Sequence, residues 1–272
     1  MGFVALIMQK VKVIMIHARE FVKIYTLEEE NKTMLKTQII EKRKSIRRYD
    51  PKKLDSETLK KVKEQLEKLT PLYSNIGYRV EIVDKTKRAF GINAPHYLLF
   101  YSEEKKGAYE NIGFIGQQMD LFFSENGLGS CWVGVAKPED KKVEEAKKSE
   151  KEIYIICISF GKPAETLHRE RKDFRRKPLS KMSQGDDPRL EAARLAPSGV
   201  NAQNWFFSHE AGKIHCYCKK TSGLKKLFLG KLALIDLGIA ICHIAKESDD
   251  FKFIHEDTAP KKEGYFYVGT AV

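Results

Sequence analysis

The feature that most constrains the fold is a segment, late in the chain, that is apolar on almost every side. Residues 231–246 read Lys-Leu-Ala-Leu-Ile-Asp-Leu-Gly-Ile-Ala-Ile-Cys-His-Ile-Ala-Lys. A helix with this pattern has no polar face for water, so it must be buried in a domain or in a membrane. The segment is shorter than the ~20 residues that a membrane span needs, and Asp236 and His243 interrupt it. We therefore expect the buried central helix of a globular protein without membrane association.

The periodicity of the flanking segments predicts an α+β protein. Apolar residues recur at helical spacing after the candidate N-cap Asp55-Ser56 and again from Tyr109, and Asp187-Pro188 opens a shorter helix. Strands are expected at residues 78–83, 97–101, 153–160, 205–209, 214–217 and 264–268. The order helix, strand pair, apolar helix and strand thus occurs twice. We expect two related α+β halves, at residues 34–180 and 181–272.

Residues 1–33 differ from this pattern and are expected to form an N-terminal extension. Their apolar run at residues 3–8 is too short for the core of a signal peptide, and no basic residue precedes it. Met34 stands just before a helical segment, so our hypothesis is that the native chain starts there.

Composition narrows the function classes. The five cysteines are odd in number and suggest no disulfide framework, so we expect a cytoplasmic protein. The net charge of +12 fits a nucleic-acid partner, but basic residues alternate with Glu along residues 60–68 and 141–151, as on solvated helix faces. His215, Cys216 and Cys218 match no metal-ligand spacing. We expect a small-molecule substrate, no nucleic acid and no metal.

Four short segments carry side chains suited to an anionic, flat ligand. Arg43-Lys-Ser-Ile-Arg47 and Arg175-Arg-Lys177 offer charged donors for a phosphate. The glycines of Gly127-Leu-Gly-Ser-Cys-Trp132 allow the backbone to lie against a ligand plane. Pro197-Ser-Gly-Val-Asn-Ala-Gln203 places amides and a hydroxyl on a rigid loop, where they can meet a heteroaromatic edge. Each segment alone also fits an ordinary turn or solvated surface.

In this order the four segments resemble those of the nitroreductase family of FMN-dependent oxidoreductases. The resemblance extends over about residues 36–270, and the Pro-Ser-x-x-Asn-x-Gln segment is its most specific part. It implies a nitroreductase-like α+β fold and a flavin that carries hydride from NAD(P)H to an electron-poor acceptor, nitroaromatic or quinone-like, in a ping-pong reaction. It names no catalytic side chain, because the flavin N5 performs the chemistry.

The resemblance also implies the roles of individual residues. The FMN phosphate would contact Arg43, Ser45 and either Arg175 or Lys177, and Arg47 would lie near the flavin N1/O2 edge. The backbone around Gly129 would approach N5, and the loop at Pro197 would border the isoalloxazine ring. The full set of expected cofactor-binding residues is Arg43, Lys44, Ser45, Arg47, Leu128, Gly129, Ser130, Arg175, Lys177, Pro197, Ser198, Asn201 and Gln203.

One departure from the family pattern is informative. Ordinary members carry the Pro-Ser-x-x-Asn loop soon after the Arg-x-Ser segment and form homodimers with two FMN sites. Here the early position, residues 69–76, is degenerate, and the intact loop lies in the second half. This pattern indicates a fused pseudo-dimer that acts as a monomer and binds one FMN. A specialised or non-catalytic flavin binder on the same scaffold, dehalogenase-like or flavin-processing, is the alternative, and a basic nucleic-acid-binding protein is a remote one.

Overall fold

The structure is a computed structural model that describes residues 38–87, 89, 91–139, 152–221 and 226–272. Within it, residues 39–272 form one compact unit. The expected N-terminal extension at residues 1–33, together with the hypothesis about Met34, lies outside the described residues.

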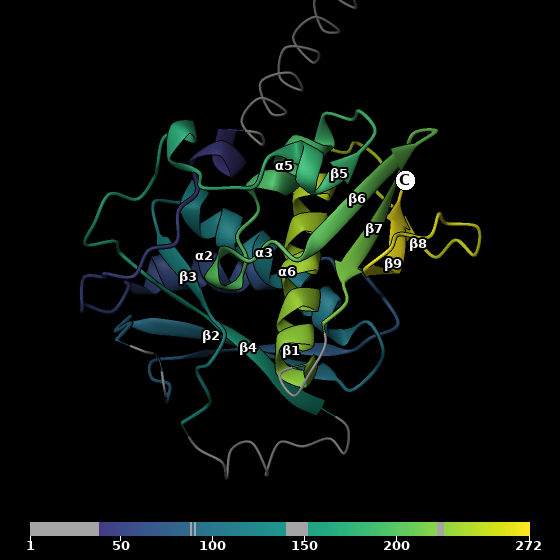
Figure 1. Ribbon diagram of the computed structural model, residues 1–272. Coiled ribbons are helices and arrows are strands. Elements are labelled where there is room, and N and C mark those ends of the chain that lie inside the picture. Colours follow the sequence, from purple (N-terminus) through teal and green to yellow (C-terminus); the bar gives the residue numbers. More distant parts are fainter. Residues whose placement is uncertain (1–37, 88, 90, 140–151, 222–225) are drawn as a thin grey trace, which may run out of the picture. The chain divides into compact units, whose positions relative to one another are not determined.

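The first half of this unit is a four-stranded antiparallel sheet with two helices. The strand order is β1-β2-β4-β3 (Figure 1). Its elements are α2 (Ser56–Leu66), β1 (Tyr78–Val83), β2 (His96–Glu103), α3 (Ala108–Glu125), β3 (Gly129–Val133) and β4 (Glu152–Gly161). The helix that starts at the N-cap Asp55 ends at Leu66, earlier than the expected position next to Pro71. The glycine-rich segment after α3 contains a strand that the sequence pattern did not predict.

The second half is a five-stranded sheet with the order β5-β6-β7-β9-β8. Its elements are β5 (Ser183–Gln184), α5 (Arg189–Leu195), β6 (Trp205–Glu210), β7 (Lys213–Lys219), α6 (Lys226–Lys246), β8 (Phe253–Ile254) and β9 (Tyr265–Ala271). The short strand β5 is parallel to β6, and the other pairs are antiparallel.

The two halves share one topology. The order β6-β7-β9-β8 repeats β1-β2-β4-β3, and in each half a long helix stands between the second and third of these strands in the sequence. Both sheets also shift register at the central pair, between Phe100 and Tyr101 in β2 and between Cys216 and Tyr217 in β7. The repetition of helix, strand pair, helix and strand expected from the sequence is therefore present in the structure.

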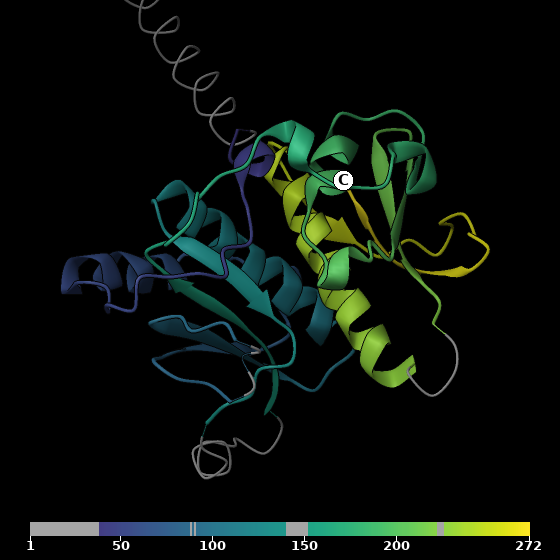
Figure 2. The same cartoon turned by 60° about the vertical axis from the view of Figure 1, so that its left-hand side comes forward.

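Helices α3 and α6 cross at the centre of the unit, and α6 runs between the two sheets (Figure 2). A methyl group on Gly113 of α3 would overlap the carbonyl oxygen of Ile235 in α6, and one on Gly238 would overlap that of Glu110 in α3. The two contacts are reciprocal, since each glycine faces the residue three positions before the other. The main core continues from this crossing into both sheets, so the apolar segment found in the sequence is the central helix, as predicted.

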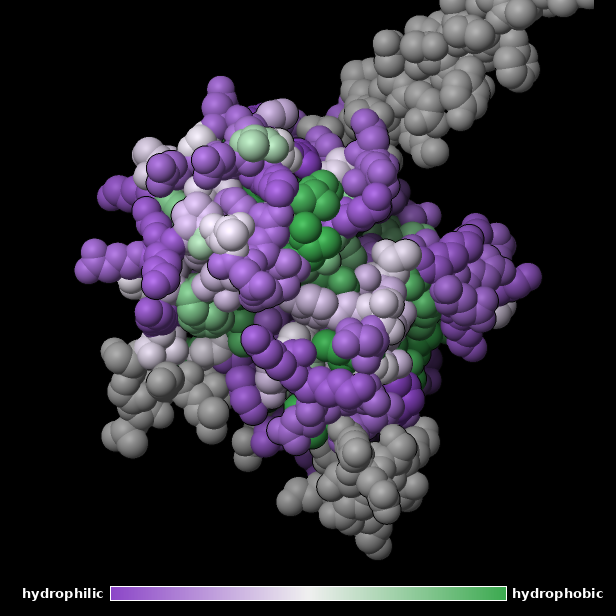
Figure 3. Space-filling view, turned by 90° about the vertical axis from the view of Figure 1, so that its right-hand side faces the viewer, coloured by the Kyte–Doolittle hydropathy of each residue, from purple (hydrophilic) through white to green (hydrophobic). Residues whose placement is uncertain are grey.

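The outer surface accounts for much of the charge. Polar and charged residues cover most of the face that Figure 3 shows, and apolar residues are visible between them. None of the helices within the described residues is long and apolar enough to cross a membrane.

We expect Gly238→Ala to lower the free energy of unfolding by about 1–3 kcal/mol, because the added methyl group must displace a backbone carbonyl at the helix crossing. Gly230→Ala is the matched control in the same helix. Its methyl group would lie 3.4 Å from Thr221 Oγ1, and its better helix propensity should stabilise α6 by up to about 1 kcal/mol. Chemical denaturation measures both, and equal effects would contradict the proposed close approach.

Candidate functional site

Arg43 is the first charged group of the site and is almost completely buried, with 1% of it exposed. Its Nε lies 2.8 Å from Asp120 Oδ2 on α3, and its Nη2 donates a hydrogen bond of 3.1 Å to Ser45 Oγ. Its Nη1 is buried and has no hydrogen-bond partner within the described part of the chain. A buried guanidinium donor without an acceptor indicates a place for an additional anionic or polar group.

Asp120 joins this arginine to the glycine-rich segment. Its second oxygen, Oδ1, accepts a hydrogen bond of 2.7 Å from Ser130 Oγ in β3. The backbone N–H of Ile46 donates to the carbonyl oxygen of Ser130 at 2.8 Å, so the two chains run side by side. At Gly129 a methyl group would overlap the side chain of Ile46, which explains why glycine is needed here. Two of the four sequence segments therefore meet.

Two further arginines lie beside Arg43. Arg169 donates from Nε to the carbonyl oxygen of Arg43 at 3.1 Å. Arg176 donates from Nη1 to Asn201 Oδ1 at 2.7 Å and from Nη2 to the carbonyl oxygen of Leu195 at 3.2 Å. The guanidinium carbons of Arg169 and Arg176 lie 4.6 and 5.5 Å from the ring centre of Phe174. We call Arg43, Arg169 and Arg176 the arginine cluster.

The cluster concentrates positive charge away from water. Burial, followed by the nearby guanidinium of Arg43, lowers the pKa of Arg169 to about 10 and that of Arg176 to about 9. Asp120 is the carboxylate in direct contact with the cluster, through Arg43. Arginines that depress one another's pKa lack negative charge nearby, so the cluster attracts an anion and offers planar donors suited to phosphate.

The loop at residues 197–203 closes the site from the second half. It contains the short 3₁₀ helix η3 (Gly199–Asn201). Asn201 Nδ2 donates to the carbonyl oxygen of Arg175 at 2.6 Å, Gln203 Oε1 accepts from the backbone N–H of Lys177 at 2.8 Å, and Ser198 Oγ accepts from the N–H of Gln203 at 3.0 Å. The loop and the late basic segment are thus held together.

The loop is conformationally strained. Val200, Asn201 and Gln203 have φ values of 46°, 58° and 50°, in the left-handed region that non-glycine residues seldom adopt. Val200 is a β-branched residue in this conformation and its side chain is fully exposed. Backbone strain and an exposed apolar side chain at a loop tip are typical of ligand-binding sites.

The remaining predicted residues of the first segment lie at the edge of the site. Lys44 Nζ lies 3.0 Å from Glu165 Oε2, whose other oxygen accepts from the N–H of Arg47 at 2.9 Å. Burial acts to raise the pKa of Glu165, but these donors outweigh it and lower the pKa to about 2. The positive charge of Lys44 is therefore neutralised, whereas the side chain of Arg47 is exposed and its charge acts on Arg169.

The structure thus brings Arg43, Ser45, Ser130 and Asn201 to one region and links the last of them to Arg176. Of the late basic residues, Arg175 is exposed, and Lys177 Nζ donates to the carbonyl oxygen of Ala202 at 2.6 Å. Leu128 and Pro197 are buried next to the polar segments. Sequence reasoning missed Arg169, Arg176 and Asp120. Only the run of three basic residues at 175–177 pointed towards one of them.

A family model described as "Putative TM nitroreductase" matches residues 36–248. This is more than half of the chain, so the protein belongs to that family, and the resemblance found in the sequence is confirmed. Membership supports an oxidoreductase function. No curated protein matches the chain.

Solved structures support the same fold. A protein from Thermotoga maritima, described as a putative nitroreductase, is 20% identical with a TM-score of 0.57, over 87% of this chain and 91% of its own. A nitroreductase family protein from Clostridium difficile 630 is 21% identical with a TM-score of 0.43, over 53% and 94%. An FMN-dependent nitroreductase from Clostridium difficile R20291 is 22% identical with a TM-score of 0.40, over 50% and 93%.

We expect Asp120→Asn to lower the free energy of unfolding by about 3–5 kcal/mol, because it leaves Arg43 buried without a counter-charge. Inorganic phosphate should restore part of this stability by supplying negative charge to the arginine cluster. Thermal denaturation in phosphate and in sodium chloride of equal ionic strength measures the effect. Asp187→Asn is the control, since Asp187 pairs with Arg189 outside the cluster and its loss should not be relieved by phosphate specifically.

Proposed function

We propose that the protein is an FMN-dependent oxidoreductase that transfers hydride from NAD(P)H to an electron-poor acceptor, nitroaromatic or quinone-like, in a ping-pong reaction. The observation that carries this proposal is the arginine cluster next to the strained loop at residues 197–203. When bound, FMN supplies the capacity to accept a hydride from one substrate and pass it to the next.

The residues fit the phosphate end of FMN. Arg43 offers the unpartnered donor Nη1, and Arg169 and Arg176 add positive charge whose lowered pKa reflects missing negative charge. In our proposal these three arginines and Ser45 bind the phosphate. Lys44 has its charge neutralised by Glu165, so it supports the first segment. Lys177 donates to backbone carbonyls and supports the loop.

The residues also fit the ring end. The paired backbone of Ile46 and Ser130 provides a surface that side chains leave open at Gly129, and the loop with Ser198 and Asn201 lies opposite in the proposed site. The exposed guanidinium of Arg47 would stabilise negative charge that develops at the N1/O2 edge during reduction. Orientation and electrostatics are then the contribution of the protein.

We further propose that the chain is a fused pseudo-dimer, with halves at residues 34–180 and 181–272, that binds one FMN as a monomer. The reciprocal glycines relate Gly113 to Gly238, so the position of Asp120 in α3 corresponds to Ala245 in α6. The second half therefore lacks the carboxylate that holds an arginine.

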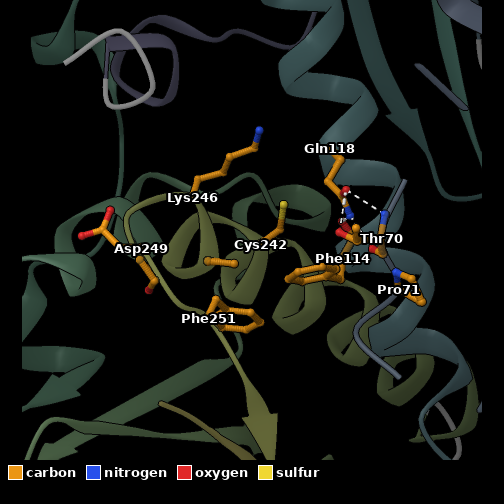
Figure 4. A pocket seen from close by; sticks show the side chains of 10 residues that line it. Thr70, Pro71, Phe114, Gln118, Cys242, Lys246, Asp249 and Phe251 are labelled. Atoms are coloured by element: carbon orange, nitrogen blue, oxygen red, sulfur yellow. Dashed lines mark hydrogen bonds between the residues drawn. The ribbon is translucent and has the colours of Figure 1, made fainter. Parts of the chain in front are cut away.

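A cavity of about 420 Å³ lies at this related position (Figure 4). Phe114 and Gln118 of α3 line it together with Cys242 and Lys246 of α6, and Thr70 and Pro71 come from the degenerate loop. No arginine is among the described residues that line it. This cavity differs from the arginine cluster in the one feature that a phosphate requires, which supports a single FMN site.

The visible spectrum of the protein titrated with FMN tests this function. We expect saturation at one FMN per chain and anaerobic bleaching of the flavin band by NADH or NADPH, followed by reoxidation with a quinone. Failure to bind FMN would contradict the proposal. Binding without bleaching would favour a non-catalytic flavin binder, and a ratio near two would contradict the pseudo-dimer.

We expect Arg176→Ala to weaken FMN binding by about 10–100-fold, because it removes a charged hydrogen-bond donor. Binding of riboflavin, which has no phosphate, should change little. Arg175→Ala is the matched control, since its side chain is exposed and adjacent in sequence. Flavin fluorescence quenching measures all four affinities. A larger effect at Arg175 would assign the phosphate contact to the residue that the family resemblance implied.

A further inference from the structure

Asp236 is a buried carboxylate in the otherwise apolar middle of α6. Only 7% of it is exposed. Both of its oxygens face one donor, the backbone N–H of Gly199, at 3.0 and 3.1 Å. Gly199 opens η3, so this contact attaches the base of the strained loop to the central helix.

The first half makes the same contact with a neutral side chain. Gly113 and Gly238 are related by their reciprocal packing, and two residues before them stand Asn111 and Asp236. Asn111 Oδ1 accepts a hydrogen bond of 3.0 Å from the backbone N–H of Tyr73. Tyr73 follows Pro71 by two residues, as Gly199 follows Pro197. One scaffold position thus holds an amide in one half and a carboxylate in the other.

The two loops differ in backbone conformation. None of the described residues 71–77 has a positive φ, whereas Val200, Asn201 and Gln203 in the second loop do. A hydrogen bond to a carboxylate is stronger than one to an amide. The charged acceptor therefore stands beneath the loop whose strain has to be offset.

The carboxylate itself is unfavourable for folding. Burial raises the pKa of Asp236 from 3.8 to about 7. Ionisation therefore costs stability as the pH rises from about 4 to 7, and the cost stays constant above pH 7. Asparagine avoids this cost at the related position in the first half. A group that reduces stability beneath a ligand loop is typical of a functional role.

We propose that Asp236 is a positioning residue that holds the loop at residues 198–203, and through it Arg176, in the arrangement that binds the flavin. The connection runs from Gly199 to Asn201 within η3, and from Asn201 Oδ1 to Arg176 Nη1 at 2.7 Å. The ligand in this inference rests on the proposed function, whereas the control of the loop does not.

Two other titratable groups face the same region. Burial, then the charges of Glu110 and Asp236, raise the pKa of Cys218 in β7 to about 12, so this thiol stays protonated near neutral pH. Burial also raises the pKa of Glu110, which approaches from α3. The loop itself contributes Ser198, Gly199 and Val200, none of which ionises. Glu110→Gln is therefore the variant that separates the two carboxyl groups.

Amide hydrogen exchange of the loop in flavin-free protein, corrected for intrinsic rates between pH 5.5 and 8.5, tests the proposal. In the wild type and in Glu110→Gln, protection at residues 198–203 should rise as the pH increases through about 7, because Asp236 becomes the stronger acceptor. In Asp236→Asn the loop should exchange faster at pH 8 and lose this pH dependence. In Asn111→Asp, the mirror-image variant, exchange at residues 198–203 should stay at the wild-type level.

Melting temperature and flavin affinity supply independent readouts. Asp236→Asn should melt higher than the wild type at pH 8, with the difference narrowing towards pH 5, yet bind FMN at least tenfold more weakly at pH 8. A purely structural role predicts a lower melting temperature. Unchanged loop exchange or a wild-type pH profile in Asp236→Asn would overturn the proposal.

The two proposals fail in different ways. If the wild type binds no FMN, the proposed function is wrong, and loop exchange alone decides the role of Asp236. If the wild type binds FMN and Asp236→Asn binds it equally well at pH 8, the role of Asp236 is wrong and the proposed function stands. Asn111 shows that asparagine fits this position of the scaffold, and the wild-type pH profile decides the question without any variant at Asp236.

Discussion

The rest of the structure depends on the close approach of α3 and α6. Gly113 and Gly238 let each helix touch the backbone of the other, and a side chain at either position would separate the two sheets that share this core. The crossing also sets the positions of Asp120 on one helix and Asp236 on the other. These two carboxylates act on different parts of one region, the first through Arg43 and the second through Gly199. The packing of two apolar helices therefore determines the geometry of a polar site.

Most of the fold was predictable from the sequence because its signals are local. Alternating and aromatic runs identified β1, β2, β4, β6, β7 and β9, and the nearly uncharged pattern of α6 identified the buried helix. Strand β3 was missed, since its glycines are typical of a loop and its conformation comes from pairing with the buried strand β4. The contact of Gly113 with α6 was expected only as an unspecified close approach.

The site was predictable to a lesser degree, for a physical reason. The segments at Arg43 and at residues 197–203 were identified from their residue types, and the structure brings both to one region. Which member of a basic run turns inward is a tertiary property. Arg176, rather than its neighbours, packs over Phe174 and reaches Asn201. Asp236 was visible in the sequence only as an interruption of an apolar helix, because its partner is a backbone N–H 37 residues away.

The connection between the halves has a consequence for how the site assembles. The arginine at position 43 and the loop at residues 197–203 lie in different halves of one covalent chain. In a dimer, such groups meet only above the dissociation constant of the subunits, and stability depends on concentration. In a single chain their effective concentration is set by the connecting segment instead. The site therefore persists on dilution, and each half is free to diverge without having to remain complementary to a copy of itself.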